Sequence, residues 1–274
     1  MLRSMYAGIS GMKNFQTKLD VIGNNIANVS TTGYKKATVS FQDLMSQTTS
    51  GAQGAAGGRG GINASQVGLG SQLGTISNTH TQGFQQVTNN PLDMAIEGDG
   101  MFVLQEEGGT TYYSRAGNFY LDEAGHIVNP DGYYLQGTVG EGANIGKIEI
   151  PTTAQSFSIS TNGTVTYISG AGDNVGNPVK AGQIMLASFS NPAGLIKDGG
   201  NLYTTSDNAG LQAALVTPEA AGAASIISGS LEMSNVDLAE EFTEMITAQR
   251  GFQANTRIIT TSDEILQELV NLKR

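Results

Sequence analysis

The segment 231–274 constrains this chain most, because it is the longest stretch with helical periodicity. It contains no proline and a single glycine, whereas the whole chain has 37 glycines. Apolar residues recur roughly every 3.5 residues, a spacing typical of a narrow stripe that packs on partner helices rather than on a broad sheet. The stripe runs through Leu238, Phe242, Met245, Gln249, Phe252, Thr256, Ile259, Asp263, Leu266 and Val270.

The two ends of this segment also carry helical signals. A second apolar line, Ile265, Leu269 and Leu272, widens the stripe near the end of the chain, so we expect more than one neighbouring helix. Asp237 is the expected N-cap, because Glu240 follows three residues later in the spacing of a capping box. A long α-helix is therefore predicted to begin directly after Asp237.

Residues 1–30 carry a matching apolar stripe and are predicted to form a second helix. Gly8, Gly11 and Gly23 lie within it, and each costs about 1 kcal/mol relative to alanine in a helix. We therefore expect this helix to need a partner, although an ordinary amphipathic helix packed on its own domain is the alternative. The stripe contains Leu2, Met5, Ile9, Met12, Gln16, Leu19, Gly23 and Ile26, with Phe15, Ile22 and Val29 beside it.

The two ends of the chain have opposite charge. Residues 1–36 hold five basic residues and one acidic residue, which gives +4. Residues 232–274 hold eight acidic and four basic residues, which gives −4, within a chain of formal net charge −10. Opposite potentials favour one register of association, even though each exposed ion pair contributes only about 0.2–1 kcal/mol. We expect the two ends to pair.

The composition and the first residues of the chain restrict the chemistry and the location that we expect for this protein. The absence of cysteine excludes disulfides, thiol catalysis and thiolate metal sites. No stretch approaches the roughly 20 apolar residues that cross a bilayer, and the first residues lack the apolar core and cleavage site of a secretory signal. We expect no membrane insertion, and either a cytoplasmic protein or one exported without a cleaved signal.

Residues 31–75 are dominated by Gly, Ser, Gln, Thr and Ala. Such a segment cannot bury enough apolar surface to fold alone, and it is longer than an ordinary loop. We predict either a flexible linker or an extended arm that becomes ordered against neighbouring copies. Arg59 lies among glycines, but one such element in an acidic chain does not indicate nucleic-acid binding.

Residues 76–230 alternate short apolar runs with turn residues, which predicts a compact antiparallel β-domain. A hairpin with a type I′ turn is predicted at Asn162-Gly163, and another at Gly98-Asp99-Gly100. The predicted fold class is α+β. Its parts are a coiled-coil-like terminal helical domain of residues 1–30 and 231–274, an extended arm of residues 31–75, and a central β-rich domain of residues 76–230.

No pattern predicts a catalytic, cofactor-binding or metal-binding site. The two histidines, His80 and His126, are isolated and expected in loops or at the surface. The Gly98-Asp99-Gly100 segment lacks the further glycine and the GK[ST] of a phosphate loop. The acidic pairs Glu106-Glu107 and Asp122-Glu123 are typical of solvated turns. We therefore expect no cofactor and no enzymatic activity.

Three motifs in order resemble the bacterial flagellar rod and hook proteins. They are NNIANVSTTGYKK near the N-terminus, LDMAIEGDGMFVL followed by YSRAGNFYLDEAGHIV in the centre, and LEMSNVDLAEEFTEMITAQRGFQANTRIITTSDEILQELVNLKR at the end. Within this family, Gly251-Phe252-Gln253 and the last seven residues are similar to the hook protein. The chain resembles its short form, with a single β-domain, whereas its length is close to that of distal rod proteins.

The resemblance implies a structural subunit of the flagellar hook. Such a subunit polymerises into a curved hollow tube that acts as a universal joint between rod and filament. The implied partners are other copies of the chain, the distal rod, hook cap and hook-filament junction proteins, and the type III export apparatus. The implied location is extracellular, in the basal body and hook.

Two alternatives remain open at this point. One is a distal rod protein that forms a straight drive shaft, and the other is a secreted β-rich carbohydrate-active or adhesive protein. For the assembling subunit, the expected interface lies on the two terminal stripes. Its residues are Leu2, Met5, Ile9, Met12, Leu19, Ile22, Ile26, Leu238, Phe242, Met245, Gln249, Phe252, Ile259, Leu266, Leu269 and Leu272.

Overall fold

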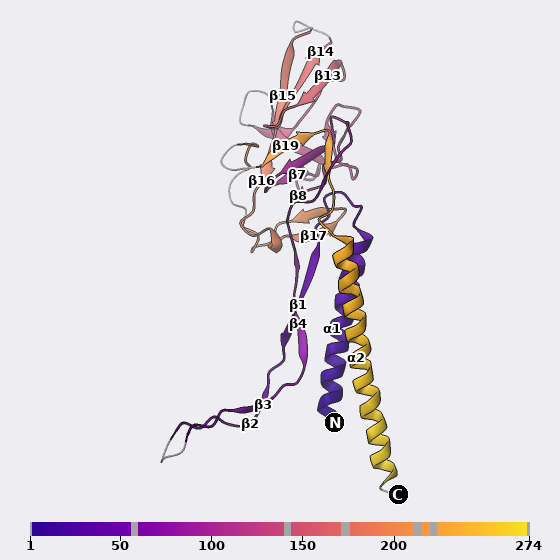
Figure 1. Cartoon of the computed structure of the whole chain (residues 1–274). Helices are drawn as coiled ribbons and strands as arrows, with labels where there is room; N and C mark the ends of the chain where they lie inside the picture. Colours follow the sequence, from indigo (N-terminus) through magenta and orange to yellow (C-terminus); the bar gives the residue numbers. More distant parts are fainter. Residues whose placement is uncertain are drawn as a thin grey trace. The chain divides into compact units, whose positions relative to one another are not determined.

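The computed structural model describes residues 2–55, 60–139, 144–170, 176–210, 215–219 and 224–272. The chain divides into two compact units (Figure 1). Unit 1 contains Met1–Ala27, Ala37–Asn78 and Asp237–Arg274, and unit 2 contains Asn28–Lys36 and Thr79–Val236. The predicted α+β class is confirmed, with one long helix near each end of the chain and antiparallel strands between them.

Unit 1 is built from two antiparallel helices and a β-ribbon. The helices are α1, Leu2–Ala27, and α2, Leu238–Asn271. The predicted N-cap is confirmed, since the Asp237 side chain accepts a hydrogen bond from the Ala239 backbone N–H at 2.8 Å. This bond satisfies one of the amide donors that a helix start leaves free.

Much of the segment predicted as an arm pairs with itself in unit 1. Strand β1, Ala37–Asp43, runs antiparallel to β4, Ser71–Asn78, and β2, Gln47–Ser50, runs antiparallel to β3, Ser65–Val67. The base of the ribbon packs on α1. Asn14 Nδ2 donates to Ser71 Oγ at 2.8 Å, and the rings of Phe15 and Phe41 meet edge to face with centroids 6.4 Å apart. Beyond this base the side chains of β2 and β3 are exposed.

The strands of unit 2 are short and antiparallel. In the described residues, the largest sheet has the order β13-β14-β15-β11-β7-β8-β18-β17, with β9, β10, β12 and β16 attached beside this path. Two further strand pairs are β6 with β19 and β5 with β20. The bounds are β5 Gln85–Val87, β6 Met94–Glu97, β7 Met101–Gln105, β8 Thr111–Ser114, β9 Tyr120–Leu121, β10 Ile127–Val128, β11 Tyr134–Val139, β12 Ile145–Lys147, β13 Ala154–Ile159, β14 Thr164–Ser169, β15 Pro178–Ile184, β16 Leu186–Ala187, β17 Ile196–Gly199, β18 Leu202–Thr204, β19 Ser225–Ser228 and β20 Ser230–Glu232, with a 3-10 turn at Pro192–Gly194.

The predicted hairpin at Asn162-Gly163 forms, but with a different turn. Strands β13 and β14 pair up to Ile159 and Val165, and the Gly163 N–H donates to the Ser160 carbonyl at 2.9 Å. The central turn residues are therefore Thr161 and Asn162. Only Gly163, at φ +76°, is left-handed, whereas a type I′ turn needs positive φ at both central residues. The type I′ prediction was wrong because the loop is longer than two residues.

The second predicted hairpin, at Gly98-Asp99-Gly100, does not form. The segment does connect two strands, and Gly98 has φ +106°. However, β6 pairs with β19 and β7 pairs with β8, β11 and β16, so the two strands separate into different sheets. Local turn chemistry identified the bend but could not identify the strand partners.

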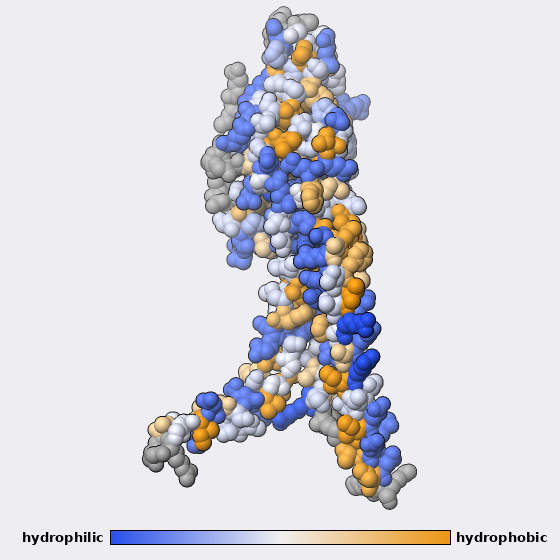
Figure 2. Space-filling view, viewed as in Figure 1, coloured by the Kyte–Doolittle hydropathy of each residue, from blue (hydrophilic) through white to orange (hydrophobic). Residues whose placement is uncertain are grey.

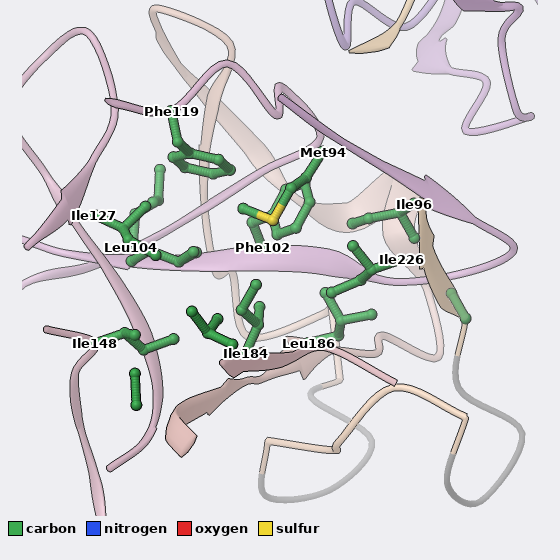
Figure 3. Close-up of a cluster of buried hydrophobic side chains, with 14 of the residues drawn as sticks. Met94, Ile96, Phe102, Leu104, Phe119, Ile127, Ile148, Ile184, Leu186 and Ile226 are labelled. Atoms are coloured by element: carbon green, nitrogen blue, oxygen red, sulfur yellow. The ribbon is translucent and has the colours of Figure 1, made fainter. Parts of the chain in front are cut away.

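The core of unit 2 lies where the sheets meet. Ile96, Phe102, Ile184 and Ile226 are fully buried, and Phe102 packs edge to face on Phe119 with ring centroids 5.2 Å apart (Figure 3). Burying each such side chain contributes about 1.5–3 kcal/mol relative to an exposed position. Unit 2 therefore has its own hydrophobic core.

Candidate assembly site

The two helices of unit 1 pack through small and polar residues. Gly11 faces the Asn255 side chain, and Gly251 faces the Phe15 ring. A β-carbon added at Gly251 would lie 2.5 Å from Phe15 Cζ, and one added at Gly11 would lie 2.9 Å from Asn255 Nδ2. These glycines therefore form holes that accept side chains of the other helix. Gly11 is thus expected to lower the stability of α1 as an isolated helix, but it also allows the two helices to pack closely.

Two polar contacts join the same faces. Lys18 Nζ lies 3.1 Å from Glu244 Oε2, which confirms one ion pair between the basic and acidic ends of the chain. Asn25 is 1% exposed, and its Nδ2 donates to Glu241 Oε2 at 3.2 Å and to the Ala37 carbonyl at 2.9 Å. The Ala37 N–H donates back to Asn25 Oδ1 at 3.0 Å. Asn25 thus ties α1 to both α2 and the start of β1.

These contacts define a seam that is rotated from the predicted stripes. We call the seam the contact line formed by Gly8, Gly11, Phe15, Lys18, Ile22 and Asn25 of α1 with Glu241, Glu244, Ala248, Gly251, Asn255, Ile259 and Ser262 of α2. At most positions it lies one residue before the predicted stripe on each helix. One residue corresponds to about 100° around an α-helix. The large apolar residues therefore lie beside the seam.

The predicted interface residues differ in how far their side chains are exposed. Ile22 is buried, and the side chain of Leu2 lies outside the described part of the chain. The half-buried residues are Met5, Ile9, Met12, Leu19, Ile26, Met245, Phe252, Ile259 and Leu266. The exposed residues are Leu238, Phe242, Gln249, Leu269 and Leu272.

Other large apolar side chains of α2 are also exposed. Ile246 is 58% exposed and Ile265 is 48% exposed. Figure 2 shows apolar surface at several places along this helix, interleaved with hydrophilic surface. Exposed apolar residues in such number on one helix are typical of a surface that another protein covers. The role of the predicted residues in assembly between copies stays a prediction.

A buried ionic cluster holds unit 2 together where the chain enters and leaves it. The Glu232 carboxylate accepts from Lys35 Nζ at 2.6 Å, from Arg115 Nη1 at 3.2 Å and from the Gly83 N–H at 3.0 Å. Lys35, Arg115 and Glu232 are 0%, 3% and 1% exposed. Burial lowers the pKa of Lys35, although the Glu232 carboxylate opposes this effect. The carboxylate is therefore the counter-charge that makes burial of both cations tolerable.

Asn235 adds a second tie between the same segments. Its Oδ1 accepts from the Lys36 N–H at 2.7 Å, and its Nδ2 donates to the Thr79 carbonyl at 2.8 Å. The Thr79 N–H in turn donates to the Lys36 carbonyl at 2.8 Å. Residues 36, 79 and 236 are three of the four ends of the two segments that form unit 2. Three distant parts of the sequence are thus joined inside unit 2.

No local sequence pattern predicts this ionic cluster. Lys35, Arg115 and Glu232 all lie in the three motifs that resemble the flagellar family, but nothing local indicates that they meet. Charged residues are almost never fully buried without a partner. A cluster of this kind is therefore found only when the tertiary structure shows the three segments together.

His80 is buried more deeply than the sequence analysis predicted. It lies in a loop, but its two ring nitrogens are buried and have no hydrogen-bond partner among the described residues. Its ring packs on Tyr203, with centroids 5.6 Å apart. Burial, together with the positive charges of Lys35, Arg115 and Lys197, lowers the pKa of His80 from 6.5 to about 4. The imidazole is therefore neutral in the folded protein at pH 7.

Two further observations concern ligands and membranes. Within the described ranges, no group of three or more His, Asp or Glu side chains is placed to hold a metal ion. None of the helices among the described residues is both long and apolar enough to cross a bilayer.

The comparisons with known proteins agree with the three motifs. Family models described as "Flagella basal body rod protein", "Flagellar hook protein FlgE/F/G D1 domain" and "Flagellar basal body rod FlgEFG protein C-terminal" match residues 5–35, 95–167 and 227–272. The flagellar basal-body rod protein FlgG of Bacillus subtilis is 55% identical over 274 residues, which cover 100% of both chains. The chain therefore belongs to the flagellar rod and hook protein family.

Two other relatives show the range of similarity. The FlgG rod protein of Agrobacterium fabrum is 39% identical over 266 residues, 96% of this chain and 97% of its own. The flagellar hook protein FlgE of Borreliella burgdorferi is 30% identical over 443 aligned residues, with both chains fully covered. The predicted family is confirmed. Within it, the comparisons support the rod alternative better than the hook interpretation.

The seam can be tested with two glycines of different surroundings. Gly23→Ala meets nothing within 4 Å, so we expect it to stabilise α1 by up to about 1 kcal/mol. Gly251→Ala meets the Phe15 ring, and overpacking of about 1–3 kcal/mol should outweigh the same helical gain. Thermal unfolding followed by helical circular dichroism measures both. Equal stabilisation by the two variants would contradict a close-packed seam.

The ionic cluster predicts a large effect for Glu232→Gln. Removing the carboxylate leaves two buried cations without a counter-charge, so we expect unit 2 to lose about 3–5 kcal/mol of unfolding free energy. The control is Glu106→Gln, at an exposed site, for which we expect a change within about 0.5 kcal/mol. Denaturant unfolding followed by tyrosine circular dichroism measures both variants. Similar losses in the two would show that the cluster is not important for stability.

His80 predicts a loss of stability in mild acid. Its folded pKa lies below the unfolded value, so only the unfolded chain gains the proton between pH 6.5 and about 4. The stability contributed by neutral His80 is present above pH 6.5 and falls by at most about 3 kcal/mol as pH drops through this window, because solvent screens a partly buried group. His80→Phe should reduce that loss, whereas His126→Phe should retain it. Unfolding free energies at pH 7 and pH 4.5 provide the comparison.

Proposed function

We propose that this protein is a structural subunit of the distal flagellar rod, which polymerises into a straight hollow drive shaft. The observation that carries the proposal is the 55% identity to a FlgG rod protein over the full length of both chains. The hook relative matches at 30%, and its alignment extends over 443 positions, well beyond the 274 residues of this chain. The rod alternative is thus better supported than the hook.

The two units suit a polymerising subunit in different ways. Unit 1 leaves large apolar residues of α2 exposed beside a seam that is already filled, so these residues remain available to other copies. Head-to-tail contacts between such surfaces give a helical filament when they do not close into a ring. Unit 2 has its own core and a buried ionic cluster, which supports a rigid outer part of the subunit. This role requires no catalytic site.

The location and partners follow from the same proposal. The subunit is exported by the flagellar type III apparatus and is incorporated in the basal body. Its principal partner is a second copy of itself, and the rod is continued by hook subunits. The hook cap and the hook-filament junction proteins were expected as partners of a hook subunit.

Electron microscopy of polymer grown from the purified chain tests the proposal. We expect straight, stiff tubes at high protein concentration, and we expect deletion of residues 239–274 to abolish them because the exposed α2 residues are lost. Curved, flexible tubes would favour the hook interpretation. Failure of the full chain to polymerise under any condition would contradict both.

A further inference from the structure

A cavity of about 230 Å³ in unit 2 borders the buried ionic cluster, because Arg115 belongs to both. Met101 and Phe189 are buried and form apolar walls of this cavity, whereas Ser188 and Asp99 are polar residues that line it. The volume is below the roughly 300–1,000 Å³ of pockets that hold drug-sized ligands. The cavity therefore suits a ligand of only a few atoms.

Arg115 has hydrogen-bond donors that the described part of unit 2 does not use. A guanidinium has five N–H groups. Nη1 donates to Glu232 Oε2 at 3.2 Å and to the Ile96 carbonyl at 3.5 Å, and Nη2 donates to the Gly98 carbonyl at 2.6 Å. The Nε–H and one Nη2–H thus have no partner among the described residues. Because an unpaired buried donor is costly, a ligand that accepts these two hydrogen bonds is favoured.

The cluster also has one positive charge in excess. Its three buried groups are the cations Lys35 and Arg115 and the single carboxylate of Glu232. Asp99 lines the cavity, but it is exposed and forms no hydrogen bond or ion pair with the described residues, so water screens most of its charge. The cavity is therefore electropositive at the Arg115 side and favours an anion.

We propose that this cavity binds a small free carboxylate through Arg115. The two oxygens of a carboxylate match two N–H groups on neighbouring nitrogens of a guanidinium. Its negative charge offsets the excess charge of the cluster, and the apolar walls of Met101 and Phe189 strengthen the interaction by excluding water. The site lies within unit 2 and does not depend on polymerisation.

His80 reports the charge of a bound ligand, because it lines the same cavity. Its ring packs on Tyr203, which stays uncharged because burial raises the pKa of its hydroxyl. Beside burial, the positive charges of Lys35, Arg115 and Lys197 hold the pKa of His80 at about 4. A bound carboxylate opposes these charges and should raise the pKa of His80.

A titration of the full chain with sodium formate tests the site. Formate is chosen because it stays ionised at lower pH than larger carboxylates, and sodium chloride at the same ionic strength is the control. The imidazole resonances of His80 and His126 are followed by NMR. We expect saturable binding with a Kd on the order of 1 mM. The pKa of His80 should rise at saturation, whereas that of His126, which does not line the cavity, should stay unchanged.

Two variants should change formate binding in opposite directions. Arg115→Lys retains the charge but removes the paired donors, so we expect the Kd to rise by at least about tenfold. Asp99→Asn removes the negative charge on the cavity wall and should lower the Kd by about threefold at low salt. Glu106→Gln changes an exposed carboxylate that does not line the cavity and should leave the Kd unchanged.

Tyrosine circular dichroism checks that each variant is folded. If Arg115→Lys unfolds unit 2, the comparison of Asp99→Asn with Glu106→Gln still decides. An equal response to chloride would overturn the proposal, since the site would then not be selective for a carboxylate. An unchanged pKa of His80 at saturating formate, or the same Kd in the Asp99 and Glu106 variants, would also overturn it.

Discussion

The close approach of α1 and α2 is the constraint on which unit 1 depends. Gly251 accepts the Phe15 ring and Gly11 accepts the Asn255 side chain, so glycines on each helix leave room for side chains of the other. The same approach determines what lies beside the seam. Phe242 and Ile246 lie outside the contact line and remain exposed. This face of α2 therefore leaves apolar surface for other copies.

Unit 2 solves a different problem, which is to hold segments that are far apart in the sequence. Lys35 follows α1 by a few residues, and Glu232 precedes α2 by a few residues, yet their side chains meet at 2.6 Å in a fully buried position. Such pairs are costly to desolvate and contribute specificity rather than large net stability. Arg115 contributes the third charge from the central strands. The result is one defined arrangement of the segments that lead to and from the helices.

The choice between hook and rod shows how local and global similarity can differ. Gly251-Phe252-Gln253 resembles the hook protein, but Gly251 also has a packing role against Phe15 within the same chain. A residue that has a packing role within the chain gives only weak support for assigning the protein to one member of the family rather than another. Identity over 274 residues averages many such contacts, and it favours the rod protein.

The sequence alone determined the α+β class, the long terminal helices, the Asp237 N-cap and the family, because periodicity, capping and motifs are encoded within short segments. It also identified most of the apolar residues beside the seam, although not the seam itself. Only the tertiary structure decided the face on which the helices meet. The side chain that a glycine accepts depends on which residue of the other helix faces it, and the sequence does not specify this. Tertiary structure likewise decided the cluster of Lys35, Arg115 and Glu232 and the burial of the two His80 ring nitrogens. Both depend on contacts between segments distant in sequence, for which no local pattern exists.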